Sequence, residues 1–300
     1  MEKALAKLKK KNFLYEKEGA LFFRSTDFGD DKDRVVQKQD GEYSYFASDI
    51  AYHDDKFLRK SDWVIDILGP DHHGYIARTK AGIEALGWGS KKFTVLIVQQ
   101  VNFIENEILV KMSKRAGKLI TMRDLIDEVG KDAARFFFLQ RSCNAHLDFD
   151  LELAKKHSLE NPIYYLQYAH ARIASIFRKA KEEKMTLPKK IDLTKLNLPE
   201  EKELAKEILE FPSVVAQSAH DLAPHQLVSF ALALAKEFQS YYSQAKHDPR
   251  YKVLNGEEPG RTGAKLYLLK NLQIVLQNIL KLLGVSAPER MEQNATGPLS

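Results

Sequence analysis

Hydrophobic and polar residues follow two patterns along the chain, and the pattern changes near residue 159. Before that point, short apolar runs are separated by glycines and clusters of polar residues, which is typical of strands mixed with helices. After it, apolar residues recur at steps of three and four, the spacing of one helix face. The two patterns predict an α/β part followed by an all-helical part.

The first part contains a strand–helix–strand unit. Trp63–Leu68 and Phe93–Val98 are short apolar runs that predict strands, and Asp71–Leu86 between them predicts a helix. A connection of this length makes the two strands parallel. Ligands of such sheets bind beyond the carboxyl ends of the strands. A candidate site is therefore expected at Gly69–His73 and at Gln99-Gln100.

Turn signals divide the segment before this unit. Gly19 lies between two runs that contain apolar residues, as in a hairpin. Asp40-Gly41 separates Val35-Val36 from Tyr43–Phe46, which is a second hairpin signal. We expect strands on both sides of each turn.

The second part begins with a strong helix signal. Asn161 can cap a helix and Pro162 suits its first position, so a helix is predicted from there through Ala180. Gly284 is predicted to end the last helix, and residues 292–300 read as a disordered tail. The apolar face of that last helix consists of Leu269, Leu272, Leu276, Ile279 and Leu283.

Composition limits the class of protein without identifying it. The chain has 300 residues and a net charge of +5, a mild excess that suits RNA but is shared by many other proteins. Cys143 is the only cysteine, so no disulfide can form within the chain and a reducing, cytoplasmic location is expected. No apolar run has the length of a transmembrane helix, so no membrane partner is expected.

Four cations and one glycine lie within the eight residues from Lys111 to Lys118. Such a segment suits nucleotidyl transfer, because negative charge builds on pyrophosphate as it leaves and mobile ammonium groups neutralise it. The alternative is a solvated basic turn. Lys111-Met112-Ser113-Lys114-Arg115 resembles the Lys-Met-Ser-Lys-Ser loop of class I aminoacyl-tRNA synthetases at four of five positions. Arg115 is the departure, and this resemblance favours the functional interpretation.

Two further groups of residues could carry chemistry. At the end of the predicted strand Trp63–Leu68, Asp71 could bind a ribose hydroxyl or a cation, and His72 could bind a phosphate. Alternatively, Asp71 could simply cap the following helix. Adjacent histidines diverge on a helix, so no structural metal is expected. Tyr45 and Asp49 share a face if their segment is helical, and a carboxylate beside a phenol suits a guanidinium. Ordinary structural bonds are the alternative for that pair.

Five segments, in this order along the chain, resemble those of arginyl-tRNA synthetases. This family activates L-arginine with ATP to arginyl-adenylate and then transfers the arginyl group to tRNA(Arg). The resemblance implies a Rossmann-like parallel sheet followed by an α-helical anticodon-binding bundle, with ATP accompanied by Mg²⁺. The segments are Tyr45-x-x-x-Asp49-Ile50-Ala51-Tyr52-His53, Gly69-x-Asp71-His72-His73-Gly74-Tyr75, Lys111 to Gly117, Asp132-Ala133-Ala134-Arg135 and Asn161-Pro162-x-Tyr164-Tyr165-x-Gln167-Tyr168-Ala169-His170-Ala171-Arg172.

The resemblance also implies roles for individual residues. Tyr45, Asp49 and His72 would bind arginine, and Lys111 and Lys114 would act in catalysis by stabilising the phosphates. The residues implied in ATP binding are Gly69, Asp71, His72, Val110, Met112 and Ser113. The residues implied in tRNA binding are Tyr165, Tyr168, Tyr242 and Met291. Aromatic rings that stack on unpaired bases suit an anticodon loop, although at least one of Tyr164, Tyr165 and Tyr168 is expected to be buried.

The His-x-Gly-His motif of class I synthetases is missing from the sequence, as is a glycine-rich phosphate loop. The chain is therefore expected to be a C-terminal portion of the enzyme: residues 1–158 as half of the catalytic domain, and residues 159–300 as the anticodon-binding domain. The full-length enzyme is expected to be monomeric, whereas an incomplete sheet favours self-association of the fragment.

Three interpretations compete. The chain is part of a functional arginine–tRNA ligase, a non-catalytic tRNA-binding module derived from one, or an unrelated nucleotide-binding α/β protein with a helical extension. Lys114, Asp49 and His72 favour the first, because a pure RNA-binding module would not need them. The loop at Lys111–Arg115 together with the helix that starts at Asn161 argues against the third.

Overall fold

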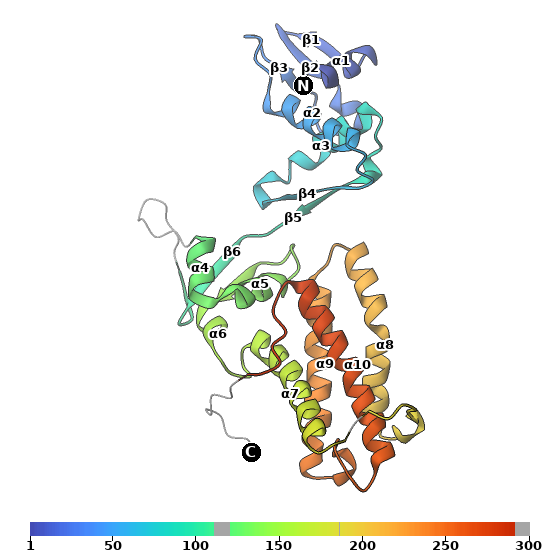
Figure 1. The fold of residues 1–300 in the computed structure, drawn as a ribbon. Coiled ribbons are helices and arrows are strands. Elements are labelled where there is room, and N and C mark those ends of the chain that lie inside the picture. Colours follow the sequence, from blue (N-terminus) through green and yellow to red (C-terminus); the bar gives the residue numbers. More distant parts are fainter. Residues whose placement is uncertain (111–120, 186, 292–300) are drawn as a thin grey trace. The chain divides into compact units, whose positions relative to one another are not determined.

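The computed structural model describes residues 1–110, 121–185 and 187–291 (Figure 1). The predicted ATP loop from Lys111 and the predicted disordered tail therefore lie outside the described residues. The chain forms two compact units. The first consists of Met1–Gln100 with Cys143–Ala145, and the second of Val101–Ser142 with His146–Ser300.

The first unit begins with helix α1 (Glu2–Lys10), which a small antiparallel sheet follows. The sheet consists of β1 (Leu14–Lys17), β2 (Ala20–Phe23) and β3 (Arg34–Gln37), with a 3-10 turn at Ser25–Phe28. The hairpin predicted at Gly19 is confirmed, because β1 and β2 pair on either side of it. The strand predicted at Tyr43–Phe46 is wrong beyond one bridge from Tyr43 to Gln37. Ser44 instead caps helix α2 (Tyr45–Leu58), its Oγ accepting from the Ala47 N–H.

The predicted strand–helix–strand unit is present. Strands β4 (Val64–Leu68) and β5 (Phe93–Ile97) run parallel and are joined through α3 (Tyr75–Leu86), with a 3-10 turn at Ser90–Lys92 before β5. The helix starts later than predicted, because Pro70–His72 first forms a separate 3-10 turn. Asp71 does not cap α3, whose N-cap residue is Gly74.

Helices α2 and α3 pack closely in the core of the first unit. Gly82 makes this approach possible, since a Cβ there would lie 3.0 Å from Cγ1 of Ile50. Buried Leu8 from α1, Phe23 from β2 and Ala47 from α2 belong to the same cluster. The packing fixes α2 beside the strand–helix–strand unit, so the side chains of both elements are presented on one scaffold.

The second unit starts with another small sheet, in the order β7-β6-β8. Strand β6 (Val101–Glu105) pairs antiparallel with β7 (Ile108–Leu109) and parallel with β8 (Leu147–Asp150). Three short helices accompany it: α4 (Met122–Val129), α5 (Lys131–Leu139) and α6 (Leu151–Lys155). Phe149 of β8 is fully buried and contacts the ring of Phe137 on α5, which ties sheet and helix together.

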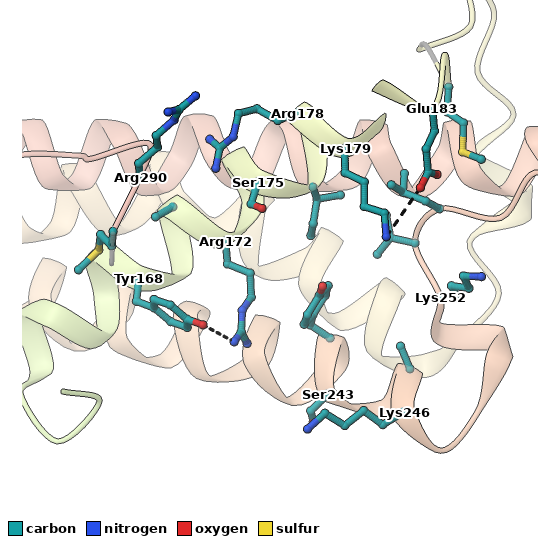
Figure 2. A pocket seen from close by; sticks show the side chains of 18 of the residues that line it. Tyr168, Arg172, Ser175, Arg178, Lys179, Glu183, Ser243, Lys246, Lys252 and Arg290 are labelled. Carbon is teal, nitrogen blue, oxygen red and sulfur yellow. Dashed lines mark hydrogen bonds and ion pairs between the residues drawn. The ribbon is translucent and has the colours of Figure 1, made fainter. Parts of the chain in front are cut away.

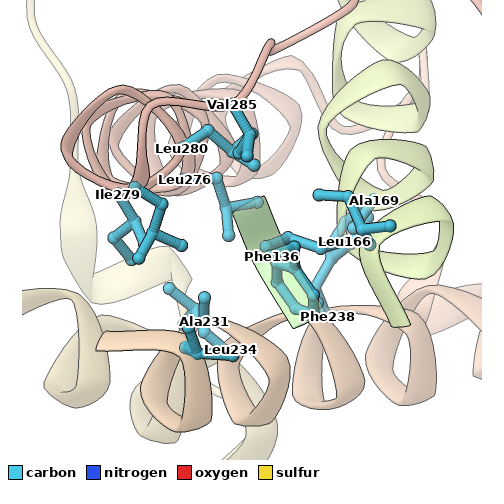
Figure 3. Packing of buried hydrophobic residues seen from close by; sticks show 14 of the residues in the cluster. Phe136, Leu166, Ala169, Ala231, Leu234, Phe238, Leu276, Ile279, Leu280 and Val285 are labelled. Atoms are coloured by element: carbon cyan, nitrogen blue, oxygen red, sulfur yellow. The ribbon is translucent and has the colours of Figure 1, made fainter. Parts of the chain in front are cut away.

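Four long helices form the rest of this unit. They are α7 (Pro162–Glu182), α8 (Pro199–His220), α9 (His225–Ser243) and α10 (Pro259–Leu283), with 3-10 turns at Leu193–Lys195, Gln244–Lys246 and Pro249–Tyr251. Leu166 of α7, Phe238 of α9 and Leu276 of α10 meet with Phe136 of α5 in one buried core (Figure 3). The predicted helix start at Asn161 is confirmed, since its side chain accepts from the Ile163 N–H.

The observed architecture agrees with the predicted fold class: a parallel strand pair with its crossover helix, then a helical bundle. The predicted domain boundary at residue 158 stays a prediction, and the two compact units divide at Gln100 instead. Within the described ranges, no helix is both long and apolar enough to cross a bilayer.

Candidate functional site

A cavity of about 1230 Å³ opens in the helical bundle of the second unit (Figure 2). Its walls come from α7, from the end of α9, from the segment 245–256 and from the residues that follow α10. Pockets for small molecules commonly have about 300–1,000 Å³. This cavity therefore has room for a ligand larger than one small molecule.

An arginine and two tyrosines form one end of this cavity. The guanidinium carbon of Arg172 lies 4.6 Å from the ring centroid of Tyr168 and 5.1 Å from that of Tyr242. Arg172 also donates to the Tyr168 hydroxyl at 2.7 Å and to the Gln239 side chain. A planar guanidinium held against two rings is a preorganised stacking platform. A planar group that enters here would contact the Arg172 guanidinium together with the tyrosine rings, rather than a single ring.

Three bonds from α7 hold the chain that follows α10. Gln167 Nε2 donates to the Ser286 carbonyl at 3.1 Å, and His170 Nδ1 donates to the Pro288 carbonyl at 2.9 Å. The third runs from the Arg178 guanidinium to the Glu289 carbonyl at 2.9 Å. Because these bonds keep residues 286–289 along α7, Met291 lies in the cavity lining.

The cavity is strongly basic. Among the described residues that line it, Glu183 is the only carboxylate, and it lies 3.7 Å from Lys179 Nζ. Against this one carboxylate stand six cations, and this excess suits a polyanion, because each phosphate of a nucleic acid carries a charge. The cations in the lining are Arg172, Arg178, Lys179, Lys246, Lys252 and Arg290.

The first unit contains a second candidate site on α2. Tyr45 and Asp49 lie one helical turn apart, as their spacing requires, and the Tyr45 side chain is 91% exposed. Burial raises the pKa of the half-buried Asp49 carboxyl, and the charges of His53 and Arg78 offset only part of that rise. A bound cation would stabilise the ionised form of Asp49.

Hydrogen bonds from two α2 side chains to Asp66 tie α2 to β4 next to Asp49. His53 Nε2 donates to Asp66 at 2.8 Å and Lys56 Nζ donates to it at 2.6 Å. Burial opposes ionisation of Asp66, but the hydrogen bonds from Lys56 and His53 outweigh it, so the pKa of Asp66 is lowered. The ionised cluster fixes the helix that carries Asp49 against the strand that leads to Gly69.

The residues after β4 form a tight turn. A Cβ at Gly69 would lie 2.9 Å from Oδ1 of Asp71, so the exposed Asp71 side chain packs back against this glycine. The ring of His72 lies 5.2 Å from that of Tyr75 on α3, and its Nε2 lies 3.7 Å from the exposed Asp71 carboxylate. The turn thus presents a carboxylate and an imidazole at the carboxyl end of β4, where α/β sheets bind ligands.

Family models match both parts of the chain. The model described as "tRNA synthetases class I (R), catalytic domain" matches residues 1–145, and the model "DALR anticodon binding domain" matches residues 166–291. Arginine–tRNA ligase 1 of Halalkalibacterium halodurans is 48% identical over 291 residues, which are 97% of this chain and 51% of that protein. The chain belongs to the arginyl-tRNA synthetase family.

A second relative and a solved structure are also similar to this chain. The arginine–tRNA ligase of Geobacillus thermodenitrificans is 49% identical over 97% of this chain and 51% of its own length. The structure of Thermus thermophilus arginyl-tRNA synthetase shares the fold, with a TM-score of 0.81 and 24% identity over 97% of this chain and 58% of that one. The chain thus spans about half the length of the curated relatives it matches. These shares do not confirm the predicted C-terminal placement.

The segment Asp132-Ala133-Ala134-Arg135, which resembles the signature of the family's anticodon-binding domain and is called the signature segment below, has a structural role in this chain. Asp132 on α5 accepts from the Ser286 N–H at 3.0 Å and from Gln167 at 3.0 Å. Arg135 on the same helix donates to the Leu283 carbonyl at 3.0 Å. Arg135 and Asp132 thus fix the end of α10 and the residue Ser286 that follows it. The chain continues from there to Met291 in the cavity lining.

The predicted tRNA-binding residues of this synthetase family do not all meet. Tyr168, Tyr242 and Met291 line the cavity, whereas Tyr165 packs half-buried against the bundle core. The expected burial of a tyrosine is confirmed, since Tyr164 and Tyr168 are each only 9% exposed. The cations at the cavity were not among the predicted tRNA-binding residues. Arg172 and Lys179 are seven apart on α7, a helical spacing that could have revealed them.

The predicted ATP-binding residues are divided between parts of the chain. Gly69, Asp71 and His72 lie together at the end of β4, and Val110 packs against the core of the second unit. Lys111, Met112, Ser113 and Lys114 lie outside the described residues. Among the residues that the structure describes, no three His, Cys, Asp or Glu side chains are grouped so that they could hold a metal ion.

Proposed function

We propose that this chain binds tRNA(Arg) through the cavity of its helical bundle and supplies part of the active site of an arginine–tRNA ligase. One observation carries the proposal: Tyr168, Tyr242 and Met291 line a single basic cavity. RNA loops are read by stacking of unpaired bases, and their phosphates are bound by cations. The cavity offers both kinds of contact to an anticodon loop.

L-arginine is the proposed amino-acid substrate. The Asp49 carboxylate would pair with the arginine guanidinium, and the exposed Tyr45 ring one turn away would lie over it. His72, at the end of β4, would contact the polar end of the same substrate. The raised pKa of Asp49 supports this role, because a cation that enters beside a poorly compensated carboxylate stabilises its charged form.

ATP is the proposed second substrate. Lys111 and Lys114 would neutralise the pyrophosphate as the arginine carboxylate attacks the α-phosphate. Met112, Ser113 and Val110 would lie near the adenine, and Gly69 and Asp71 near the ribose. Mg²⁺ would arrive on the ATP phosphates as part of this substrate.

We propose that the isolated chain binds tRNA more readily than it forms arginyl-adenylate, because its sequence has no His-x-Gly-His motif. Filter binding of tRNA(Arg) and arginine-dependent ATP–pyrophosphate exchange, measured on the same preparation, test this. Retention of tRNA(Arg) with exchange far below that of a full-length relative is the expected result. Exchange at the full-length rate would overturn it, and absence of tRNA binding would overturn the role of the cavity.

A non-catalytic tRNA-binding module derived from a synthetase is the second candidate function. The preserved Asp49 and His72 favour the ligase instead, because RNA binding by the bundle does not use them. Calorimetry with L-arginine separates the two. Binding that is lost in Asp49→Asn supports the ligase, whereas no arginine binding by the folded chain supports the module.

A further inference from the structure

A lysine is buried in the helical bundle beside the cavity. Lys265 on α10 is 1% exposed, and burial lowers the pKa of its ammonium group. A buried charge persists in a folded protein only where its donors find acceptors. The partners of Lys265 therefore show what this group is for.

All three donors of the ammonium group have an acceptor. Nζ donates to the backbone carbonyl of Arg250 and, at 3.0 Å, to that of Lys252. Its third neighbour is Oε1 of Glu201 at 3.5 Å, a carboxylate that is fully buried as well. Two of the three acceptors thus belong to one short stretch of backbone, and the third is the counter-charge.

Glu201 is itself held in place. Its Oε1 accepts from the Tyr241 hydroxyl at 3.2 Å, and its Oε2 accepts from the Leu198 N–H at the start of α8. The pair Glu201–Lys265 therefore links α8, α9 and α10 to the backbone at residues 250–252.

The anchored segment forms one wall of the cavity. Lys252 and Leu254 line it, as does Gly256 just beyond, and Figure 2 shows Lys252 beside the other lining side chains. A second tie lies one turn before Lys265 on α10. There the buried Thr262 hydroxyl accepts from the Asn255 N–H at 3.0 Å and donates to the Asn255 carbonyl at 2.9 Å.

We propose that Lys265 and Thr262 are positioning residues for RNA binding: they hold the backbone from Arg250 to Asn255 so that Lys252 faces a phosphate of the bound RNA. The inference rests on the proposed tRNA binding by the cavity. The alternative is that Lys265 and Thr262 only stabilise the bundle, in which case Lys252 would act equally well without them.

A mutant cycle between Lys252 and its anchors separates the two possibilities, because they predict different effects of Lys252→Ala on tRNA affinity once the anchors are removed. Lys265→Met alone would leave Glu201 buried without its cation, which destabilises the fold. The variant Lys265→Met with Glu201→Gln removes both charges. Its amide oxygen can still accept from the Leu198 N–H, and its amide N–H can donate to the Tyr241 hydroxyl oxygen. Thr262→Val is nearly isosteric and changes no charge. Thermal melts by circular dichroism identify which variants are folded, and Thr262→Val carries the test if the double variant is not.

Filter binding of tRNA(Arg) by the full chain at several salt concentrations is the readout. In the wild-type chain, Lys252→Ala should weaken binding several-fold and reduce the slope of log affinity against log salt by about 1, the value for one phosphate contact. In the anchor variants, Lys252→Ala should change the affinity less than twofold and leave the slope unchanged. If the anchors served stability alone, their removal would lower the melting temperature, but Lys252→Ala would have the same effect on affinity and salt slope as in the wild-type chain.

Glu203→Gln with Lys206→Met is the matched control. This exposed pair on α8, with an N–O distance of 3.4 Å, loses the same two charges away from the cavity lining. The effect of Lys252→Ala should stay at its wild-type size there. An equal effect of Lys252→Ala in the wild-type and folded anchor variants overturns the positioning role alone, whereas wild-type chain that binds no tRNA overturns the proposed function as well.

Discussion

Aspartates of the first unit differ in function because their surroundings differ. Burial opposes ionisation of Asp30, but hydrogen bonds from Arg34 and from the Asp31 N–H outweigh it and lower the pKa of Asp30 to about 2. At Asp49 burial prevails and the pKa is raised, because the charges of His53 and Arg78 compensate it only in part. Asp30 is thus a completed structural ion pair, whereas Asp49 still gains from a cation, as expected of a guanidinium-binding residue.

Asp30→Asn should destabilise the first unit, because the depressed pKa means that the folded state holds the ionised carboxylate more strongly than the unfolded chain does. The loss should be about 2 kcal/mol at pH 7, at about 1.4 kcal/mol per pKa unit. This contribution is present above pH 4 and is lost as the pH falls towards 2. Urea unfolding followed by tryptophan fluorescence measures it, since both tryptophans, Trp63 and Trp88, lie in this unit.

Asp31→Asn is the control for this measurement. Its carboxylate also contacts Arg34, but the side chain is 73% exposed, and exposed ion pairs contribute about 0–1 kcal/mol. Equal losses for Asp30→Asn and Asp31→Asn, or a loss for Asp30→Asn that does not shrink in acid, would contradict the assignment.

Individual elements of the bundle are fixed by their ends. Helix α10 stops at Gly284, which adopts the left-handed conformation with φ of 71°. Arg135 of the signature segment bonds the last carbonyl of that helix, at Leu283. The chain then turns along α7 and reaches the cavity with Met291. The position of the C-terminal end of α10 therefore determines whether Arg290 and Met291 line the cavity.

Gly284→Ala should destabilise the bundle by about 2 kcal/mol. A left-handed alanine costs about 1–2 kcal/mol, and the added Cβ would lie 2.7 Å from Arg135 Nε, which would have to leave the Leu283 carbonyl. Thermal melts at 222 nm measure this loss. Gly260→Ala on the same helix is the control: a Cβ there meets nothing within 4 Å, so its melt should stay close to wild type. Similar melts for both variants would contradict the predicted strain.

At the scale of the whole chain, local signals predicted what is local. The apolar runs predicted β4 and β5, Asn161-Pro162 predicted the start of α7, and Gly284 predicted the end of α10. The turn signal at Asp40-Gly41 led to the wrong prediction of a strand at Tyr43–Phe46. A hairpin signal does not reveal that Ser44, three residues after Gly41, caps helix α2.

The candidate site was predictable only in part, for a physical reason. Tyr168, Tyr242 and Met291 were identified by resemblance, yet they meet only because α7, α9 and the segment after α10 pack together. The cations of the cavity and the anchor at Lys265 are likewise assembled from residues far apart in the sequence. No periodicity along one segment encodes such a contact, whereas Arg172 and Lys179, on one helix, could have been read from their spacing.

The central claim is that the bundle cavity recognises the anticodon loop of tRNA(Arg). Competition filter binding tests it most directly, with wild-type chain, labelled tRNA(Arg), and unlabelled tRNA(Arg) transcripts that differ only in the anticodon nucleotides. The account predicts that the unchanged transcript competes at least about tenfold better than the altered ones, the factor that corresponds to about 1.4 kcal/mol. Equal competition by all transcripts would contradict the claim.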